Sequence, residues 1–377
     1  MQKINCQICF YSDAPEWGGQ EILAARIANS LVDSFAKILF FYSCEPFQNA
    51  LDPKIQAIRL PFAASTPFPI FRDRSRRKRK IVQNLFQKHR VENLVVCPGN
   101  IERCLPAIFA ADRLGIFTVS YCPMAYTQRE SGAAFGAIRD LLAKTVYPKI
   151  SEWIVISKTQ ERLLRRFIAK EVPVHRLSNP LNVTEIGAPK IPDSPLRIAT
   201  IGRIYFPQKG QDLIPKAARM LKEESFPCTF HIIGDGPDKE TLDALIKKNH
   251  VEDSVRLSQW MPPQLLHQKM KSDFDILLLP SHFEGDPLVI PEAMACGLPV
   301  LIADEEYAKE FALPDWMTFS PGNLSDAVFK IQNFSKNYDE AVFMETRNRL
   351  TKERSPESFR QNTHSIFSKI FAQNAHE

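Results

Sequence analysis

The 377-residue chain lacks any run of about 18 apolar residues, which excludes a helix that spans a membrane. Its first ten residues hold one lysine and no long apolar stretch before a small-residue cleavage site, so we expect no secretory signal and a cytoplasmic location. Eight cysteines in so long a chain indicate reduced thiols rather than a disulfide framework. The eight histidines show no metal-ligand spacing. We expect neither a metal ion nor another bound cofactor.

Glycine is also scarce, with 14 residues in the chain, and this limits phosphate-binding loops. Gly234-Asp-Gly-Pro lacks the third glycine of the dinucleotide fingerprint, which disfavours an oxidoreductase. The composition, 44% hydrophobic and 24% charged, is that of a globular protein. At roughly 100 to 200 residues per domain, the length indicates two domains or one large one.

Charge is unevenly distributed. The net charge of +5 divides into +11 for residues 1–190 and −6 for residues 191–377. Arg72–Lys80 holds seven cations in nine residues and follows residues 61–71, which hold three phenylalanines. This segment suits an anionic membrane surface, a nucleic acid or simply a solvated loop. Nothing else in the chain resembles a nucleic-acid module, so we expect no nucleic-acid partner.

Short apolar runs alternate with helical patterns along both halves of the chain, which is typical of βαβ units with parallel strands. A proline-rich stretch, residues 179–195, separates the halves. The strands expected before it are 4–11, 37–42, 93–97, 117–121 and 153–157, and those after it are 197–201, 229–233, 255–257, 275–279 and 299–302. We therefore predict an α/β fold of two Rossmann-like doubly wound domains, residues 1–188 and 189–355. The two would face a central cleft at the carboxyl ends of their strands.

Residues 280–300 carry the strongest functional signal. Pro291 has no N–H, so the helix here begins no earlier than about Leu288, and Gly297 is suited to end it. Glu284 then lies in the loop before the helix and Glu292 in its early part. Both can face the cleft at the carboxyl edge of the sheet, where carboxylates accept hydrogen bonds from sugar and ribose hydroxyls. The amides of Leu288 and Val289, at the helix N-terminus, offer an anion site.

Two further segments point to phosphate. Arg203 and Lys209 flank the loop after the strand that ends near Gly202, and two cations at the mouth of a sheet suit a diphosphate. Gly18 and Gly19, between the first strand and the first helix, let backbone amides approach an anionic ligand. Taken alone, the glycine pair is better explained as an ordinary turn.

Together these motifs resemble the glycosyltransferases of family 4, which are retaining enzymes with the GT-B fold. Gly202-Arg…Lys209-Gly, Ile233-Gly-Asp-Gly-Pro and Glu284-x7-Glu292 occur in the family's order, and Glu-Ala-Met-Ala-Cys-Gly-Leu-Pro-Val runs on from Glu292. The resemblance covers nearly the whole chain and is best over residues 197–302. It implies transfer of a sugar, with retention, from a UDP- or GDP-sugar to a glycan or lipid-linked acceptor. Polysaccharide, lipopolysaccharide or glycolipid assembly would be the setting.

The same resemblance implies roles for single residues. Arg203 and Lys209 would hold the donor diphosphate and act in catalysis together with Glu284, which would bind hydroxyls of the transferred sugar. Glu292 would bind the ribose.

Other parts of the chain would complete the site and the domain. By resemblance, Gly18 and Gly19 would approach the phosphates and the backbone near Met261 would meet the base. Residues 1–188 would bind the acceptor, in a domain completed by helix 356–377, and residues 189–355 would bind the nucleotide-sugar donor.

Two departures from the family's pattern bear on function. Many members have Phe-Gly where this chain has Asp286-Pro287, and Asp286 would bind a sugar hydroxyl or cap the helix. Many members also carry a histidine after the strand equivalent to 117–121, on the acceptor side of the site, where this chain reads Cys122-Pro-Met-Ala-Tyr-Thr. A non-catalytic nucleotide-sugar binding or scaffold protein of the same fold is therefore the alternative. If the enzyme meets a membrane, the contact would be peripheral, on the inner face, through Arg72–Lys80.

Overall fold

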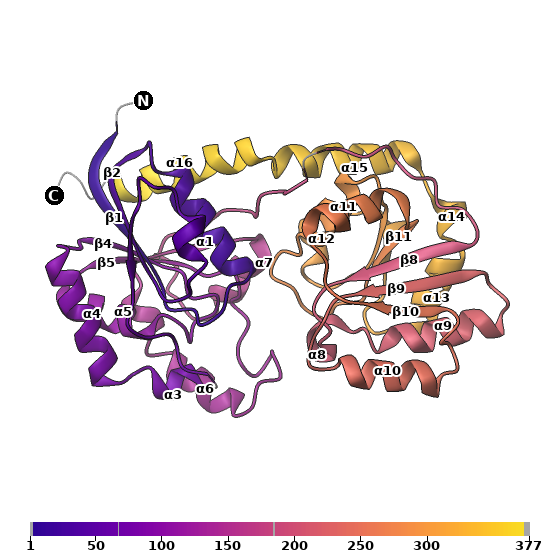
Figure 1. Ribbon diagram of the computed structural model, residues 1–377, viewed down its shortest axis with the longest axis horizontal. Helices are drawn as coiled ribbons and strands as arrows, with labels where there is room; N and C mark the ends of the chain where they lie inside the picture. The colour runs from indigo at the N-terminus through magenta and orange to yellow at the C-terminus, as the bar shows by residue number, and fades with distance from the viewer. Residues whose placement is uncertain (1–2, 67, 184, 373–377) are drawn as a thin grey trace. The chain divides into compact units, whose positions relative to one another are not determined.

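The computed structural model describes residues 3–66, 68–183 and 185–372, which form two compact units (Figure 1). Unit 1 runs up to Asn179 and resumes at Glu357, and unit 2 spans Pro180–Pro356. The boundary expected between residues 188 and 189 thus lies inside unit 2. Helix α16 (Pro356–Ala372) belongs almost wholly to unit 1, and residues 373–377 of the expected helix 356–377 lie outside the described residues.

Across the described residues, unit 1 is built on a seven-stranded sheet in the order β3-β2-β1-β4-β5-β6-β7, with parallel pairing throughout. From β1 the chain adds β2 and β3 on one side of the sheet, and it then adds β4 to β7 on the other side. This reversal between β1 and β4 is the doubly wound pattern expected from the sequence. The strands are β1 (Ile4–Ser12), β2 (Phe35–Tyr42), β3 (Gln56–Arg59), β4 (Asn93–Val96), β5 (Phe117–Tyr121), β6 (Glu152–Val155) and β7 (Val174–Arg176).

Helices cover both faces of this sheet. On one face α1 and α16 pack against β1 and β2, and on the other α4 and α5 bury their apolar sides (Figure 1). Phe359, Phe367, Ile370 and Phe371 of α16 are buried in the first of these cores. The helices are α1 (Gly19–Ser30), α2 (Phe47–Ala50), α3 (Pro69–Arg72), α4 (Arg76–Lys88), α5 (Leu105–Leu114), α6 (Gly136–Ala143), η1 (Tyr147–Lys149) and α7 (Lys158–Leu164).

The basic segment is largely helical rather than a loop. Ser75 caps α4, because its hydroxyl accepts a hydrogen bond from the Lys78 amide at 3.3 Å. Val82 and Phe86, four residues apart, face the core. The cations of residues 76–80 therefore occupy the first turns of an anchored helix.

Unit 2 repeats the architecture. Its described residues form a six-stranded parallel sheet in the order β10-β9-β8-β11-β12-β13, which turns between β8 and β11. The strands are β8 (Leu196–Ile201), β9 (Cys228–Ile233), β10 (Val255–Ser258), β11 (Ile276–Leu279), β12 (Val300–Ala303) and β13 (Thr318–Phe319). The helices are α8 (Phe206–Lys209), α9 (Leu213–Glu223), α10 (Lys239–Lys248), α11 (Pro263–Ser272), α12 (Val289–Ala295), η2 (Ala308–Glu310), η3 (Asp315–Met317), α13 (Leu324–Gln332), α14 (Phe334–Asn337) and α15 (Glu340–Glu353).

The structure gives two findings on its helices and its thiols. Among the described residues, every helix is too short or too polar to cross a bilayer. All eight cysteines are free thiols, and six of them are buried.

Candidate functional site

The carboxyl ends of β8 and β11 mark the point where the strand order of unit 2 turns, and the loops that leave this edge pack backbone against backbone. A Cβ added to Gly234 would lie 1.9 Å from the carbonyl oxygen of Gly202, and one on Gly210 would lie 2.3 Å from that of Pro280. Gly210 also has a φ of +61°, which favours glycine. The loops after β8, β9 and β11 therefore hold one another in place.

Lys209 and Glu284 meet at this edge. The Lys209 Nζ lies 2.5 Å from Glu284 Oε1, and the two side chains are 16% and 7% exposed. Ser281 Oγ donates a second hydrogen bond to the same carboxylate at 2.8 Å, and Gln208 Nε2 a longer one at 3.4 Å. The sequence placed both charges at one sheet edge, but nothing in it indicated that they form an ion pair.

Arg203 is the exposed cation of this group. Its guanidinium lies over the ring of Tyr205, with 5.7 Å between the guanidinium carbon and the ring centroid. Because Lys209 and Glu284 neutralise each other, Arg203 supplies the net positive charge beside them.

Helix α12 begins as its sequence requires. Leu288 is the N-cap, Pro291 occupies the third helical position, and Gly297 follows the C-cap with a φ of +83°. Glu292 is thereby placed in the first turn, and its Oε2 lies 3.9 Å from His267 Nε2 of α11. The helix start predicted at about Leu288 is confirmed.

Asp286, for which the sequence left sugar binding or helix capping open, has a partner of a different kind. Its carboxylate is fully buried and lies 2.6 Å from Arg354 Nη1, at the C-cap of α15. Arg354 itself is 6% exposed and also lies over the Phe311 ring. The loop that carries Glu284 is thus tied to α15 by a buried ion pair.

Gly18 and Gly19 belong to unit 1, and Met261, which the resemblance places near the base, belongs to unit 2. Gly18 is the N-cap of α1, and its amide donates to the carboxylate of Glu21 at 3.0 Å, so this amide already has an anionic partner within the chain. A Cβ on Gly19 would meet nothing within 4 Å. Met261, after β10, is half-buried against the core of unit 2, whereas Trp260 beside it is 59% exposed. Their roles toward a donor remain predictions.

Unit 1 holds a buried acid that the sequence did not single out. Asp13 follows β1, accepts a hydrogen bond from the Cys104 amide at 3.1 Å and is fully buried. Burial raises the pKa of this carboxyl to about 6, and the Cys104 hydrogen bond limits the rise. The segment after β5 is pinned in the same unit, where the Ala125 amide donates to the buried side chain of Gln160 at 2.7 Å.

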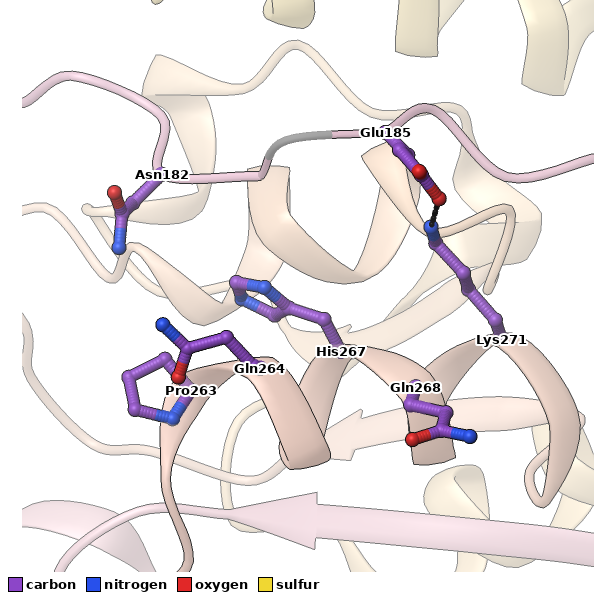
Figure 2. A pocket seen from close by; sticks show the side chains of 7 residues that line it. All are labelled: Asn182, Glu185, Pro263, Gln264, His267, Gln268 and Lys271. Atoms are coloured by element: carbon purple, nitrogen blue, oxygen red, sulfur yellow. Dashed lines mark hydrogen bonds and ion pairs between the residues drawn. The ribbon is translucent and has the colours of Figure 1, made fainter.

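A pocket of about 430 Å³ opens beside His267 (Figure 2). Side chains of α11 form one wall and Asn182 and Glu185 the other, where Glu185 pairs with Lys271 at 3.3 Å. His267 lines this pocket and lies close to Glu292, so it stands between the pocket and the start of α12. None of these lining residues was foreseen, because polar side chains on an amphipathic helix have no distinctive sequence signal.

Within the ranges 3–66, 68–183 and 185–372, no cluster of three or more His, Cys, Asp or Glu side chains has a geometry that could hold a metal ion. The acidic groups near β11 instead face the cations Lys209 and Arg354.

Comparison with known proteins adds three findings. Residues 184–354, nearly all of unit 2, match the family model of the glycosyl transferases group 1. The chain is 28% identical over 309 residues to a lipopolysaccharide 1,6-galactosyltransferase of Salmonella typhimurium (strain LT2), covering 79% of this chain and 80% of that protein. Two proteins named putative colanic acid biosynthesis glycosyltransferase WcaL, of Escherichia coli (strain K12) and Salmonella typhimurium (strain LT2), are 35% and 32% identical to this chain. Each of these matches covers only 29% of the relative's own length.

Solved structures agree on the fold. The apo form of the lipopolysaccharide outer core galactosyltransferase WaaB superposes with a TM-score of 0.72 at 19% identity, over 97% of this chain and 100% of that one. HepE of Anabaena, in complex with UDP and glucose, superposes with a TM-score of 0.70 at 16% identity, over 96% and 99%. The fold is therefore that of the GT-B glycosyltransferases, and its second half matches the group 1 family model.

Proposed function

We propose that the protein is a retaining glycosyltransferase of family 4. It would move a sugar from a nucleotide-diphosphate sugar, with UDP or GDP as the nucleotide, to a glycan or lipid-linked acceptor. The relative that aligns over most of its length is named for lipopolysaccharide synthesis, so we place the reaction in the assembly of lipopolysaccharide or another surface polysaccharide.

One observation carries this proposal. Lys209 and Glu284 form a shielded ion pair at the point where the strand order of unit 2 turns, with Arg203 exposed beside them. Ligands of open α/β sheets bind at such a point. The cations provide charge for a diphosphate, and the carboxylate provides acceptors for sugar hydroxyls. Both lie inside the segment that matches the family model.

The proposed chemistry divides between these groups. Arg203 and Lys209 stabilise the negative charge that develops on the departing diphosphate, a contribution made mainly in the transition state. Glu284, already held by Ser281 and Lys209, orients the transferred sugar. Glu292 in α12 binds the ribose, and the amides of Leu288 and Val289 lie at the same helix start.

Retention follows from the family resemblance rather than from the geometry. Glu284 is engaged by Lys209, and Asp286 by Arg354, so neither is suited to attack the sugar as a nucleophile. We propose that the acceptor attacks on the face from which the diphosphate leaves, and that the leaving phosphate takes the acceptor's proton. The anomeric C–O bond to the diphosphate breaks as the bond to the acceptor oxygen forms. A metal ion has no assigned part in this scheme.

Calorimetry with a panel of UDP-, GDP- and ADP-sugars tests the proposal first. We expect one nucleotide series to bind, and Glu284→Gln to retain that binding while turnover falls about 100-fold, the scale of one lost transition-state contact. Turnover is measured as release of nucleoside diphosphate with and without oligosaccharide acceptors.

Three outcomes separate the candidates. Binding with neither transfer nor hydrolysis, over a full set of acceptors, would favour a non-catalytic nucleotide-sugar binding protein. Failure of every nucleotide sugar to bind would reject both. Inversion at the transferred anomeric carbon, read by NMR of the product, would reject the retaining mechanism alone.

A further inference from the structure

Unit 1 exposes a group of large apolar side chains that the fold leaves uncovered. Phe71 of α3 is 46% exposed, while Phe135, Ile138 and Leu141 at and within α6 are 66%, 54% and 64% exposed. Phe68 joins them, since its ring centroid lies 6.3 Å from that of Phe71 and 5.9 Å from that of Phe135. Helices α3 and α6 also lie side by side (Figure 1). These side chains thus form one patch, the α3/α6 patch.

The patch sits on a fixed support. Arg139, on the inner side of α6, donates to Glu102 at 2.8 Å and to Gln128 at 2.9 Å, and is itself buried. Arg74 holds the other end of α6 through the Leu142 carbonyl at 2.9 Å. Ile138 and Leu141, three residues apart, therefore share the outward side of an anchored helix. Because α6 is anchored in this orientation, Ile138 and Leu141 stay exposed in the folded unit.

Cations accompany the patch in α3 and at the start of α4, although fewer are exposed than the sequence indicated. Of the seven in residues 72–80, Arg74 supports α6, and Lys78 is consumed internally by Asp73 at 2.5 Å and the Ala63 carbonyl at 2.9 Å. Arg79 is half-buried. The exposed cations of this segment are Arg72, Arg76, Arg77 and Lys80, and Lys144 at the end of α6 is exposed as well.

We propose that the α3/α6 patch docks the protein on an anionic lipid membrane, with its apolar side chains among the acyl-chain ends and the exposed cations against lipid phosphates. Apolar groups rimmed by Lys and Arg bind anionic bilayer surfaces through both terms at once. A nucleic acid could stack bases on the phenylalanines of the patch, but the aliphatic Ile138 and Leu141 offer no stacking face and suit acyl chains better. The charge and the aliphatic character together favour lipid.

This inference deepens the proposed function by placing its acceptor. Helix α6 follows β5 through residues 122–135, the segment that the family resemblance assigns to the acceptor side. A lipid-linked acceptor held in the membrane would then meet the enzyme at the surface that carries this segment.

Co-sedimentation with vesicles tests the docking. The vesicles are of phosphatidylcholine alone or mixed with phosphatidylglycerol, at low and high salt. We expect binding to the anionic vesicles only, and a loss of about 100-fold in Arg76→Gln/Arg77→Gln/Lys80→Gln, since each cation near such a surface contributes about fivefold. Ile138→Ser/Leu141→Ser should weaken binding at both salt concentrations. Phe329→Ser, at an apolar residue of unit 2 that is 57% exposed, is the matched control and should bind as the wild type does.

Two results would overturn the proposal. One is a wild-type protein that stays in the supernatant with anionic vesicles at low salt. The other is an Ile138→Ser/Leu141→Ser variant that binds vesicles as tightly as the wild type, because binding would then depend on charge alone. Equal retention of both proteins on single-stranded RNA would identify such a general attraction to polyanions. Nucleotide-sugar binding by calorimetry is independent of these outcomes, so a failed docking leaves the proposed transferase standing, and the reverse also holds.

Discussion

The ion pair between Lys209 and Glu284 makes a prediction that separates its structural from its ligand-binding role. Lys209→Met keeps most of the side-chain volume but leaves the Glu284 carboxylate, 7% exposed, without its cation. Removing one partner of a buried pair typically costs about 3 to 5 kcal/mol. Here Ser281 still donates to the carboxylate and Lys209 is 16% exposed, so we expect a smaller loss of about 2 to 3 kcal/mol.

A double-mutant cycle isolates the pair. Glu284→Gln in the Lys209→Met background removes the stranded charge, so the double variant should lose clearly less stability than the sum of the two single variants. The expected coupling is about 1 to 3 kcal/mol. Because a chain with two units need not unfold in one step, the free energy is best read by hydrogen exchange of β8 and β11 peptides in a urea series.

The same cycle bears on the diphosphate. In Lys209→Met the uncompensated carboxylate repels an anionic ligand, whereas in the double variant the charge at this spot is zero, as it is in the wild type. We expect the nucleoside diphosphate to bind Lys209→Met most weakly and to regain affinity in the double variant, measured by calorimetry. Additivity within about 0.5 kcal/mol in both stability and affinity would refute the reasoning.

Four further predictions concern single side chains. Arg354→Met strands the buried Asp286 carboxylate and should lower the free energy of unfolding by about 3 kcal/mol, read from exchange of α12 peptides; an unchanged value would mean that the pair is not coupled to this loop. Since burial raises the pKa of Asp13 to about 6, the folded chain keeps a proton that the unfolded chain releases between about pH 4 and pH 6, so stability should fall as pH rises through that window. Asp13→Asn should remove this fall, of up to about 3 kcal/mol, in urea titrations across the window, and a fall that persists would point to another group. Glu292→Gln should raise the donor KM with little change in kcat in initial-rate assays, and a kcat loss at unchanged KM would contradict ribose binding. Arg203→Ala should weaken binding of the diphosphate but not of the uncharged nucleoside in calorimetry, and equal weakening of both would contradict a phosphate contact.

Local rules predicted much of this fold. Strand β5 was expected at the residues where it lies, and α12 begins where Pro291 allows, because a missing N–H restricts a helix start regardless of tertiary context. The short edge strands β3 and β7 were missed, since three or four residues carry too little periodicity to be recognised.

The candidate site was predicted only in part, because its contacts join residues far apart in the chain. Arg354 reaches Asp286 across 68 positions, and Lys209 reaches Glu284 across 75. A pattern can place each charge at an element's end, but only packing decides which charges meet. The basic run shows the same limit, since nothing in its composition distinguishes Lys78, bound to Asp73, from the exposed Lys80.

Helix α16 gives the chain an unusual order of completion during synthesis. Phe359, Phe367, Ile370 and Phe371 belong to the core of unit 1, yet they are made after all of unit 2. At about 5 to 20 residues per second, the ribosome needs roughly 9 to 35 seconds to pass from Pro180 to Pro356. Unit 2, whose residues are contiguous, can therefore fold first. Until α16 is made, the sheet face around Phe10 and Phe40 lacks the cover that this helix provides. The half of the protein that emerges first is the last to be finished, and during that interval its apolar face is a target for chaperones.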